Sequence, residues 1–133
     1  MILVDTSVWI DWLRRGDRPA TLALDRLIDE GEIVLAPVVL QELLQGAKGP
    51  EQLAKLRRYF EPLPMLLPRA ATYADAGVLY ARCRWAGVTP RSPHDCLIAQ
   101  LAVEHGVSLL HDDRDFELIA GVEQRLRLAG YTP

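Results

Sequence analysis

The amino-acid sequence predicts a single α/β domain in which a parallel central sheet carries helices on both faces. Short apolar runs with the content of buried strands alternate with longer segments that end in helix-capping residues. No internal repeat, low-complexity tract or linker divides the chain. The 133 residues are enough to bury about two-thirds of the unfolded surface in one core. We therefore expect residues 1–133 to form one domain.

The first half of the chain supplies two predicted strands and four predicted helices. Gly31 stands where a helix C′ residue belongs, and Pro37 suits the first turn of the helix that follows it. The expected elements are a strand at 2–4, helices at about 7–14 and 20–30, a buried parallel strand at 33–36, and helices at 37–46 and about 51–60.

In the second half, the prolines of residues 63–68 allow only an edge strand or an extended connection. Ser92 is a good N-cap and precedes Pro93 at a first helical position, so a helix should run from there to Gly106. The other expected elements are a long helix from about 69 to 85, a strand at 107–110, a short helix around 116–120 and a marginal strand that contains Leu126 and Leu128.

The composition favours a cytoplasmic protein with no membrane association. The strongly apolar stretch 33–40 is too short to span a bilayer, and the first four residues lack the basic lead of a signal peptide. Cys83 and Cys96 are too few for a disulfide framework and do not have the spacing of zinc ligands. We expect both to be small buried side chains.

Four acidic residues occur at positions where chemistry is expected. Asp5 and Asp113 follow predicted strands, so they should lie at the carboxyl edge of the sheet, where α/β folds bind ligands. Asp95 lies in the first turn of a predicted helix, and Glu42 lies within an apolar helix opening where a buried charge would be costly.

Each acid also has a purely structural interpretation. Asp5 could cap a helix, and Asp113 or Asp115 could form an Asx-turn. Asp95 could stabilise its helix by placing a negative charge at the positive N-terminal end of the helix dipole, and Glu42 could face solvent.

Taken together, the acids favour a site for hard divalent cations. Carboxylates that converge repel one another unless cations lie between them, and oxygen ligands suit Mg²⁺ or Mn²⁺. A pair of such ions can polarise an attacking water and stabilise a leaving oxygen at phosphorus, so the pattern predicts phosphodiester hydrolysis. The net charge of −3 would otherwise argue against a nucleic-acid partner, but two bound divalent cations would offset it.

The segments around these acids resemble, in order, the four signature blocks of the PIN-domain ribonucleases, and the length and block order resemble the VapC toxins of type II toxin–antitoxin pairs. The blocks are VDTSVWID ending at residue 11, VVLQELLQG at 38–46, RSPHDCLIA at 91–99 and LLHDDRDF at 109–116. The resemblance implies a Mg²⁺- or Mn²⁺-dependent endoribonuclease that acts on structured RNA such as tRNA. It also implies a homodimer that a VapB-type antitoxin inhibits.

The resemblance assigns roles to individual residues. The metal-binding quartet of the family matches, by position, Asp5, Glu42, Asp95 and Asp113. Asp115 matches a common additional acid, and Ser7, with Thr6 beside it, matches the polar residue that supports the site.

Two further residues near the blocks have open interpretations. His111 departs from the Thr or Ser that many members carry, and we expect a hydrogen-bonded histidine at a strand end rather than a proton-transfer group. Arg91 is the candidate contact to RNA phosphate, and an ordinary solvated loop arginine is the alternative. Trp9 and Trp12 favour core packing, with a dimer or antitoxin surface as the alternative.

Rival classes fit less well. A haloacid-type phosphatase would need a second Asp where Ser7 stands, and a receiver domain would need a Lys after a late strand, whereas Lys48 and Lys55 lie in mid-chain. A PIN-like module that binds RNA or protein without cutting it is the alternative from outside enzymology. Metal-dependent cleavage that is lost in Asp5→Asn, with folding retained, separates the two.

Overall fold

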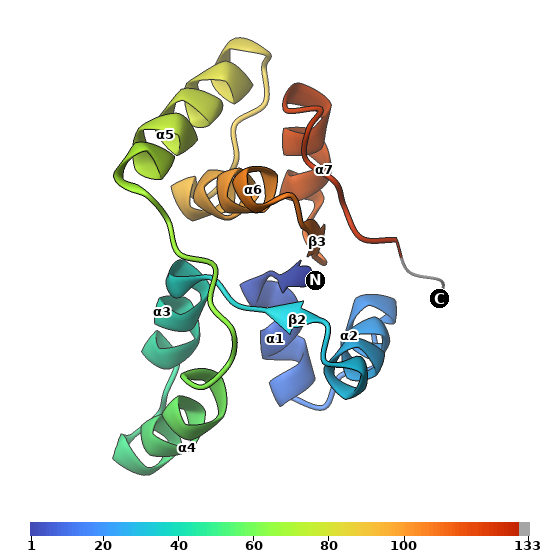
Figure 1. The fold of residues 1–133 in the computed structure, drawn as a ribbon, viewed down its shortest axis with the longest axis vertical. Helices are drawn as coiled ribbons and strands as arrows, with labels where there is room; N and C mark the ends of the chain where they lie inside the picture. Colours follow the sequence, from blue (N-terminus) through green and yellow to red (C-terminus); the bar gives the residue numbers. More distant parts are fainter. Residues whose placement is uncertain (131–133) are drawn as a thin grey trace.

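The computed structural model describes residues 1–130, and at its centre lies a three-stranded parallel sheet (Figure 1). The strands are β1 (Ile2–Val4), β2 (Ile33–Val34) and β3 (Ser108–Leu110), in the order β2-β1-β3. Ile2 of β1 lies opposite both Ile33 and Ser108. Because β1 is the middle strand, its residues Leu3 and Val4 are fully buried. The predicted parallel central sheet is confirmed.

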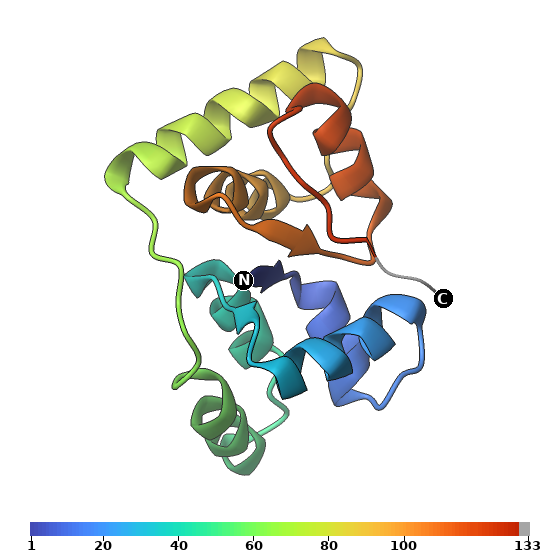
Figure 2. The same ribbon diagram turned by 45° about the vertical axis from the view of Figure 1, so that its right-hand side comes forward.

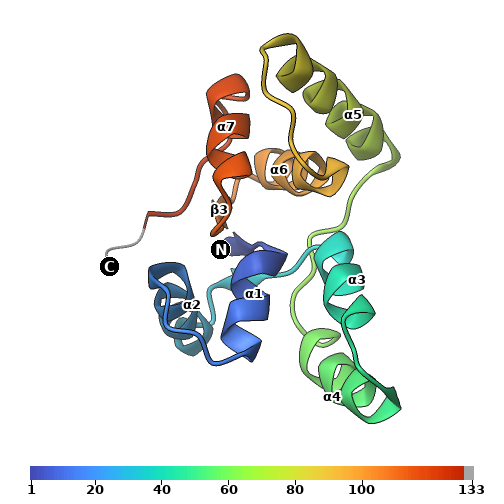
Figure 3. The ribbon, with the colours of Figure 1, turned by 180° about the vertical axis from the view of Figure 1, so that it is seen from behind.

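Helices flank the sheet on both sides. Figures 2 and 3 show α5, α6 and α7 gathered at one end of the molecule and α1 to α4 at the other, with β1 between the two groups. The helices are α1 (Thr6–Leu13), α2 (Pro19–Glu30), α3 (Pro37–Gln45), α4 (Pro50–Phe60), α5 (Ala70–Trp85), α6 (Pro93–His105) and α7 (Arg114–Val122).

Helix ends follow the capping residues of the sequence. Ser92 Oγ accepts a hydrogen bond from the backbone N–H of His94 at the start of α6. Gly31 and Gly106 end α2 and α6 in the left-handed conformation, with φ of 69° and 64°, which glycine adopts without a steric penalty. These caps confirm the predicted boundaries of both helices to within about a residue.

Three predicted elements differ in length. The strand expected at 33–36 is only Ile33–Val34, and Leu35 beyond it forms an isolated parallel bridge with Met65. Residues 63–68, expected as either an edge strand or an extended connection, form no strand beyond this one bridge. The first helix begins at Thr6 rather than residue 7, and the last one spans Arg114–Val122 rather than 116–120, because Asp5 and Asp113 act as their N-caps.

The marginal strand near the C-terminus is reduced to a single parallel bridge between Leu128 and Leu109. Residues 131–133 of the predicted domain lie outside the described residues. Cys83 and Cys96 are free and buried, as expected.

An aromatic cluster closes the core beneath α1. Trp9 is fully buried and packs edge-on against Phe60 and Trp12, with ring centroids 5.0 and 5.5 Å apart. Core packing is therefore confirmed for Trp9. Trp12 is only partly buried, and its Nε1 donates to Asp25 Oδ1 over 2.8 Å.

None of the helices in the described part of the chain is long and apolar enough to cross a membrane.

Candidate functional site

The parallel sheet brings Asp5 and Asp113 to one edge. Asp5 follows β1 directly, and its backbone N–H donates to the carbonyl of Leu110, the last residue of β3, over 2.9 Å. Asp113 lies three residues beyond Leu110 and caps α7. Because the two strands are parallel neighbours, the segments after them start from the same carboxyl edge.

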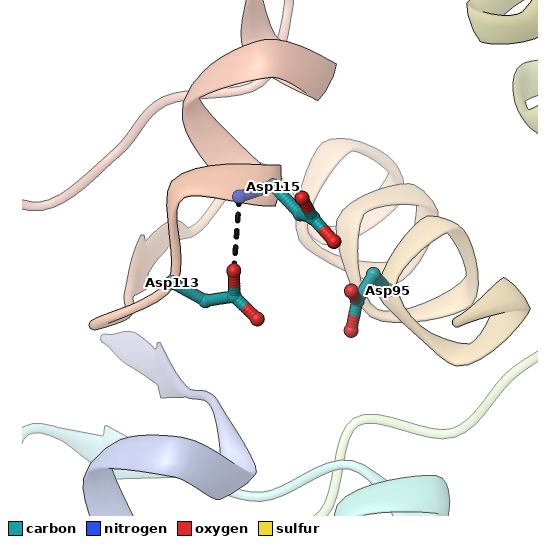
Figure 4. A group of neighbouring side chains, drawn as sticks. All are labelled: Asp95, Asp113 and Asp115. Atoms are coloured by element: carbon teal, nitrogen blue, oxygen red, sulfur yellow. Dashed lines mark hydrogen bonds between the residues drawn. The ribbon is translucent and has the colours of Figure 1, made fainter. Parts of the chain in front are cut away.

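Three carboxylates converge above this edge. Asp95 comes from the first turn of α6, and Asp113 and Asp115 come from the start of α7. One oxygen of each lies within 4.8 Å of the others, and Figure 4 shows the three side chains turned toward a common space. Their spacing allows a single cation to contact all three.

Two side chains of α1 hold the remaining acids in place. Asp5 is 5% exposed, and its Oδ2 accepts hydrogen bonds from Ser7 Oγ at 2.6 Å and from the Ser7 backbone N–H at 3.2 Å. Thr6 Oγ1 donates to Glu42 Oε1 over 2.9 Å. Ser7 and Thr6, which were expected to support the site without a named partner, thus contact Asp5 and Glu42.

The electrostatics of Asp95 tie all five acids into one cluster. Burial, followed by the negative charges of Asp5, Asp113, Asp115 and Glu42, raises the pKa of Asp95 to about 7. Burial also raises the pKa of Asp5, although the hydrogen bonds from Ser7 oppose the shift. The cluster therefore carries more negative charge than its surroundings neutralise.

This donor set fits a hard divalent cation. All the candidate ligands are carboxylate oxygens, which Mg²⁺ and Mn²⁺ prefer, and the raised pKa of Asp95 indicates that a positive charge here would be stabilised.

Arg91 lies across the acidic cluster. Its Nη2 donates to Asp113 Oδ1 over 2.8 Å, and its Nε and backbone N–H donate to Asp115 Oδ2 over 3.2 and 3.0 Å. The backbone N–H of Arg91, and then its side chain, lower the pKa of Asp115. The side chain is nevertheless 76% exposed. Neither interpretation from the sequence anticipated these two carboxylate partners.

Two histidines border the site. His111 is 8% exposed, and its Nδ1 accepts from the Asp113 backbone N–H over 3.1 Å, so it is the hydrogen-bonded histidine that was expected. His94 was missed by the sequence analysis. Its Nδ1 lies 3.8 Å from Glu42 Oε2, and the only signal that could have indicated it is its position beside Asp95.

A parallel sheet with acidic residues at its carboxyl edge is the arrangement expected of the family that the sequence resembles, and a comparison with family models identifies the same family. The PIN domain model matches residues 2–122. The chain belongs to the PIN-domain family, and within that family it is of the VapC type.

The assignment to the VapC type rests on sequence relatives. The chain is 37% identical to ribonuclease VapC11 of Mycobacterium tuberculosis over 125 aligned residues. The aligned region covers 92% of this chain and 93% of the relative. It has the same identity and coverage with the VapC ribonuclease Mb1587 of Mycobacterium bovis.

Solved structures agree on the fold. VapBC2 from Rickettsia felis, bound to a DNA fragment from its promoter, aligns with a TM-score of 0.75 at 21% identity, covering 99% of this chain and 100% of that chain. DNA-bound VapBC from Salmonella typhimurium aligns with a TM-score of 0.72 at 22% identity, covering 96% of each chain.

Proposed function

We propose that this chain is a divalent-cation-dependent endoribonuclease and the toxin of a pair with a VapB-type antitoxin. The observation that carries the proposal is the convergence of Asp95, Asp113 and Asp115, whose carboxylate oxygens lie within 4.8 Å of one another at the sheet edge. The relatives named as VapC ribonucleases support the activity, and the VapBC complexes among the structural neighbours support the antitoxin partner.

In this proposal Mg²⁺ or Mn²⁺ is held by the acidic quartet, with Asp115 as an additional acid. When bound, the cation supplies Lewis-acid activation of water and neutralises charge that develops at phosphorus. The quartet is Asp5, Glu42, Asp95 and Asp113.

The side chains around the quartet fix its geometry before any cation or substrate arrives. Ser7 orients the Asp5 carboxylate by donating two hydrogen bonds to its Oδ2. Thr6 orients the Glu42 carboxylate by donating one hydrogen bond to its Oε1. Asp113 Oδ1 accepts the Asp115 backbone N–H over 3.0 Å, so the start of α7 holds that carboxylate. Such fixed ligands lose little freedom when they bind, which favours both affinity and reaction.

The proposal also includes the kind of RNA that is cut and the oligomeric state of the protein. The RNA would be structured, such as tRNA, with its backbone phosphate near Arg91 and the acids, and the protein would act in the cytoplasm as a homodimer. No protein side chain needs to become covalently attached to RNA, because water is the nucleophile in this scheme.

Cleavage of total RNA by the purified protein tests this function. We expect discrete fragments with Mg²⁺ or Mn²⁺ and intact RNA with EDTA. Asp95→Asn should leave RNA intact, whereas Asp29→Asn, an exposed position on α2, should cut normally. RNA that survives the folded, inhibitor-free wild type in both metals would favour the non-catalytic PIN-like binding module and contradict the proposal.

A further inference from the structure

Arg91 joins the two acids that begin α7. Its Nε and Nη2 do not form a fork on one carboxylate but contact Asp115 Oδ2 and Asp113 Oδ1 separately, at 3.2 and 2.8 Å. Both acids belong to the group of three whose oxygens lie within 4.8 Å. A guanidinium therefore supplies positive charge at the place where the proposed function puts a divalent cation.

We propose that Arg91 is an exchangeable internal counter-cation: its guanidinium neutralises Asp113 and Asp115 before metal binding, and the arriving divalent cation displaces it toward the RNA phosphate. This inference rests on the proposed function and deepens it. Arg91 would act as a positioning residue for the metal and as a binding residue for the substrate. Metal loading and phosphate recognition would then be linked through one side chain.

The backbone of Arg91 provides a fixed point for this exchange. Its N–H donates to Asp115 Oδ2 over 3.0 Å independently of the side chain. Arg91 also directly precedes Ser92, the N-cap of α6, so its main chain is held from both directions. In the proposed exchange the guanidinium would leave the carboxylates by side-chain rotation, while the backbone hydrogen bond to Asp115 holds the loop.

The ion pairs of Arg91 with Asp113 and Asp115 are exposed and weak, so a divalent cation could displace the guanidinium. The Arg91 side chain is 76% exposed, and ion pairs in such surroundings contribute little because solvent screens them. A divalent cation has twice the charge, and it could also contact Asp95, which the described residues provide with no ion-pair partner. The guanidinium and the cation would repel each other at this distance, so both do not remain on the same acids.

The charge of the substrate gives the released side chain a partner. Arginine binds phosphate through several N–H donors, and the exposed face of Arg91 is already open to solvent beside the acids. Once the cation has replaced it, the guanidinium would be free to bind a backbone phosphate next to the one that is cut. The same residue would contribute nothing to RNA binding while it remains on Asp113 and Asp115.

Calorimetric titration with Mn²⁺ tests the first half of the exchange. We expect Arg91→Ala to bind Mn²⁺ about two- to fivefold more tightly than wild type, the scale of a lost exposed ion pair. Arg114→Ala is the matched control. Arg114 is exposed and influences Asp115 by its charge, but the described residues include no hydrogen-bond partner for its side chain. Equal affinities in the two alanine variants would mean that only general charge matters and would overturn the exchange.

Steady-state cleavage at saturating Mn²⁺ tests the second half. Arg91→Ala should raise the KM for RNA about tenfold, with most of the loss in KM rather than kcat, and Arg91→Lys should restore part of it because it keeps the charge. An unchanged KM would overturn the phosphate role.

Asp95→Asn separates the exchange proposed for Arg91 from the proposed function. If it abolishes Mn²⁺ binding while Arg91→Ala binds as wild type does, the metal site stands and the exchange fails. If wild type binds no Mn²⁺, both fail.

Discussion

The hydroxyl of Thr6 donates a 2.9 Å hydrogen bond to Oε1 of Glu42, and this bond joins the first residue of α1 to the middle of α3. The contact spans 36 positions of the sequence. It turns a glutamate from a largely apolar helix toward the acids at the sheet edge, where its charge contributes to the raised pKa of Asp95. The position of Glu42 in the cluster therefore depends on its hydroxyl donor.

Thr6→Val should uncouple Glu42 from the site while the shape of the side chain is kept. We expect RNA cleavage to fall by about tenfold and the free energy of unfolding to fall by about 1 kcal/mol, the usual contribution of one such hydrogen bond. Thr6→Ser retains the hydroxyl and should stay near wild type in both measurements. If the Val and Ser variants cleave RNA equally fast, Thr6 does not orient Glu42.

Asp113 has two separable roles, as the N-cap of α7 and as a candidate metal ligand. Asp113→Asn keeps an oxygen that can accept from the Asp115 backbone N–H, whereas Asp113→Ala does not. Both variants lose the same charge, so their difference isolates the cap. In urea unfolding without divalent cations, the Ala variant should be about 1 kcal/mol less stable than the Asn variant. Both should bind Mn²⁺ weakly, and a stable Ala variant would contradict the capping role.

The order of elements was predictable because each depends on local sequence. Ser92, Pro93 and Gly106 bound α6, and the apolar run at Ile33–Val34 forms a buried strand. The limits of β2 were not predictable. Leu35 leaves β2 to pair with Met65, and a contact between segments thirty residues apart has no local signal.

The acids of the site were predictable, but their partners were only partly so. Asp5 and Asp113 follow strands, which is a position that sequence reveals. The contact of Arg91 with two carboxylates depends on how the loop before α6 meets α7, and neither sequence segment indicates it. The contact between His94 and Glu42 also depends on packing, in this case of α6 beside α3.

The raised pKa of Asp95 predicts a pH dependence of stability in the metal-free protein. The ordinary pKa of the group is 3.8, and the folded value is about 7, so between these values the folded state holds a proton that the unfolded state has lost. The contribution of Asp95 to stability therefore falls as pH rises from about 4 to about 7. Asp95→Asn should become more stable relative to wild type across this range, by about 1–2 kcal/mol after allowance for solvent screening.

Urea unfolding of both proteins at several pH values, with EDTA present, measures this effect. A stability difference that does not change with pH would contradict the shift. In the same range the affinity of wild type for Mn²⁺ should increase with pH, because the cation competes with the proton on Asp95.

The aromatic cluster makes a separate prediction about stability. Trp9 of α1 is fully buried and packs against Phe60 of α4, so Trp9→Ala should cost about 3–5 kcal/mol in urea unfolding. Trp12→Ala should cost less, because Trp12 is only partly buried, although its hydrogen bond to Asp25 is lost too. Equal losses at the two positions would contradict the burial difference between them.

If the acids at the sheet edge hold the cation that RNA cleavage requires, a crystal grown with Mn²⁺ should contain the ion there. We expect an anomalous peak about 2.0–2.3 Å from carboxylate oxygens of Asp95 and Asp113, close to Asp5. The same peak should be absent in Asp95→Asn. Manganese bound elsewhere, or no peak at a concentration that supports cleavage, would contradict a metal site at these acids.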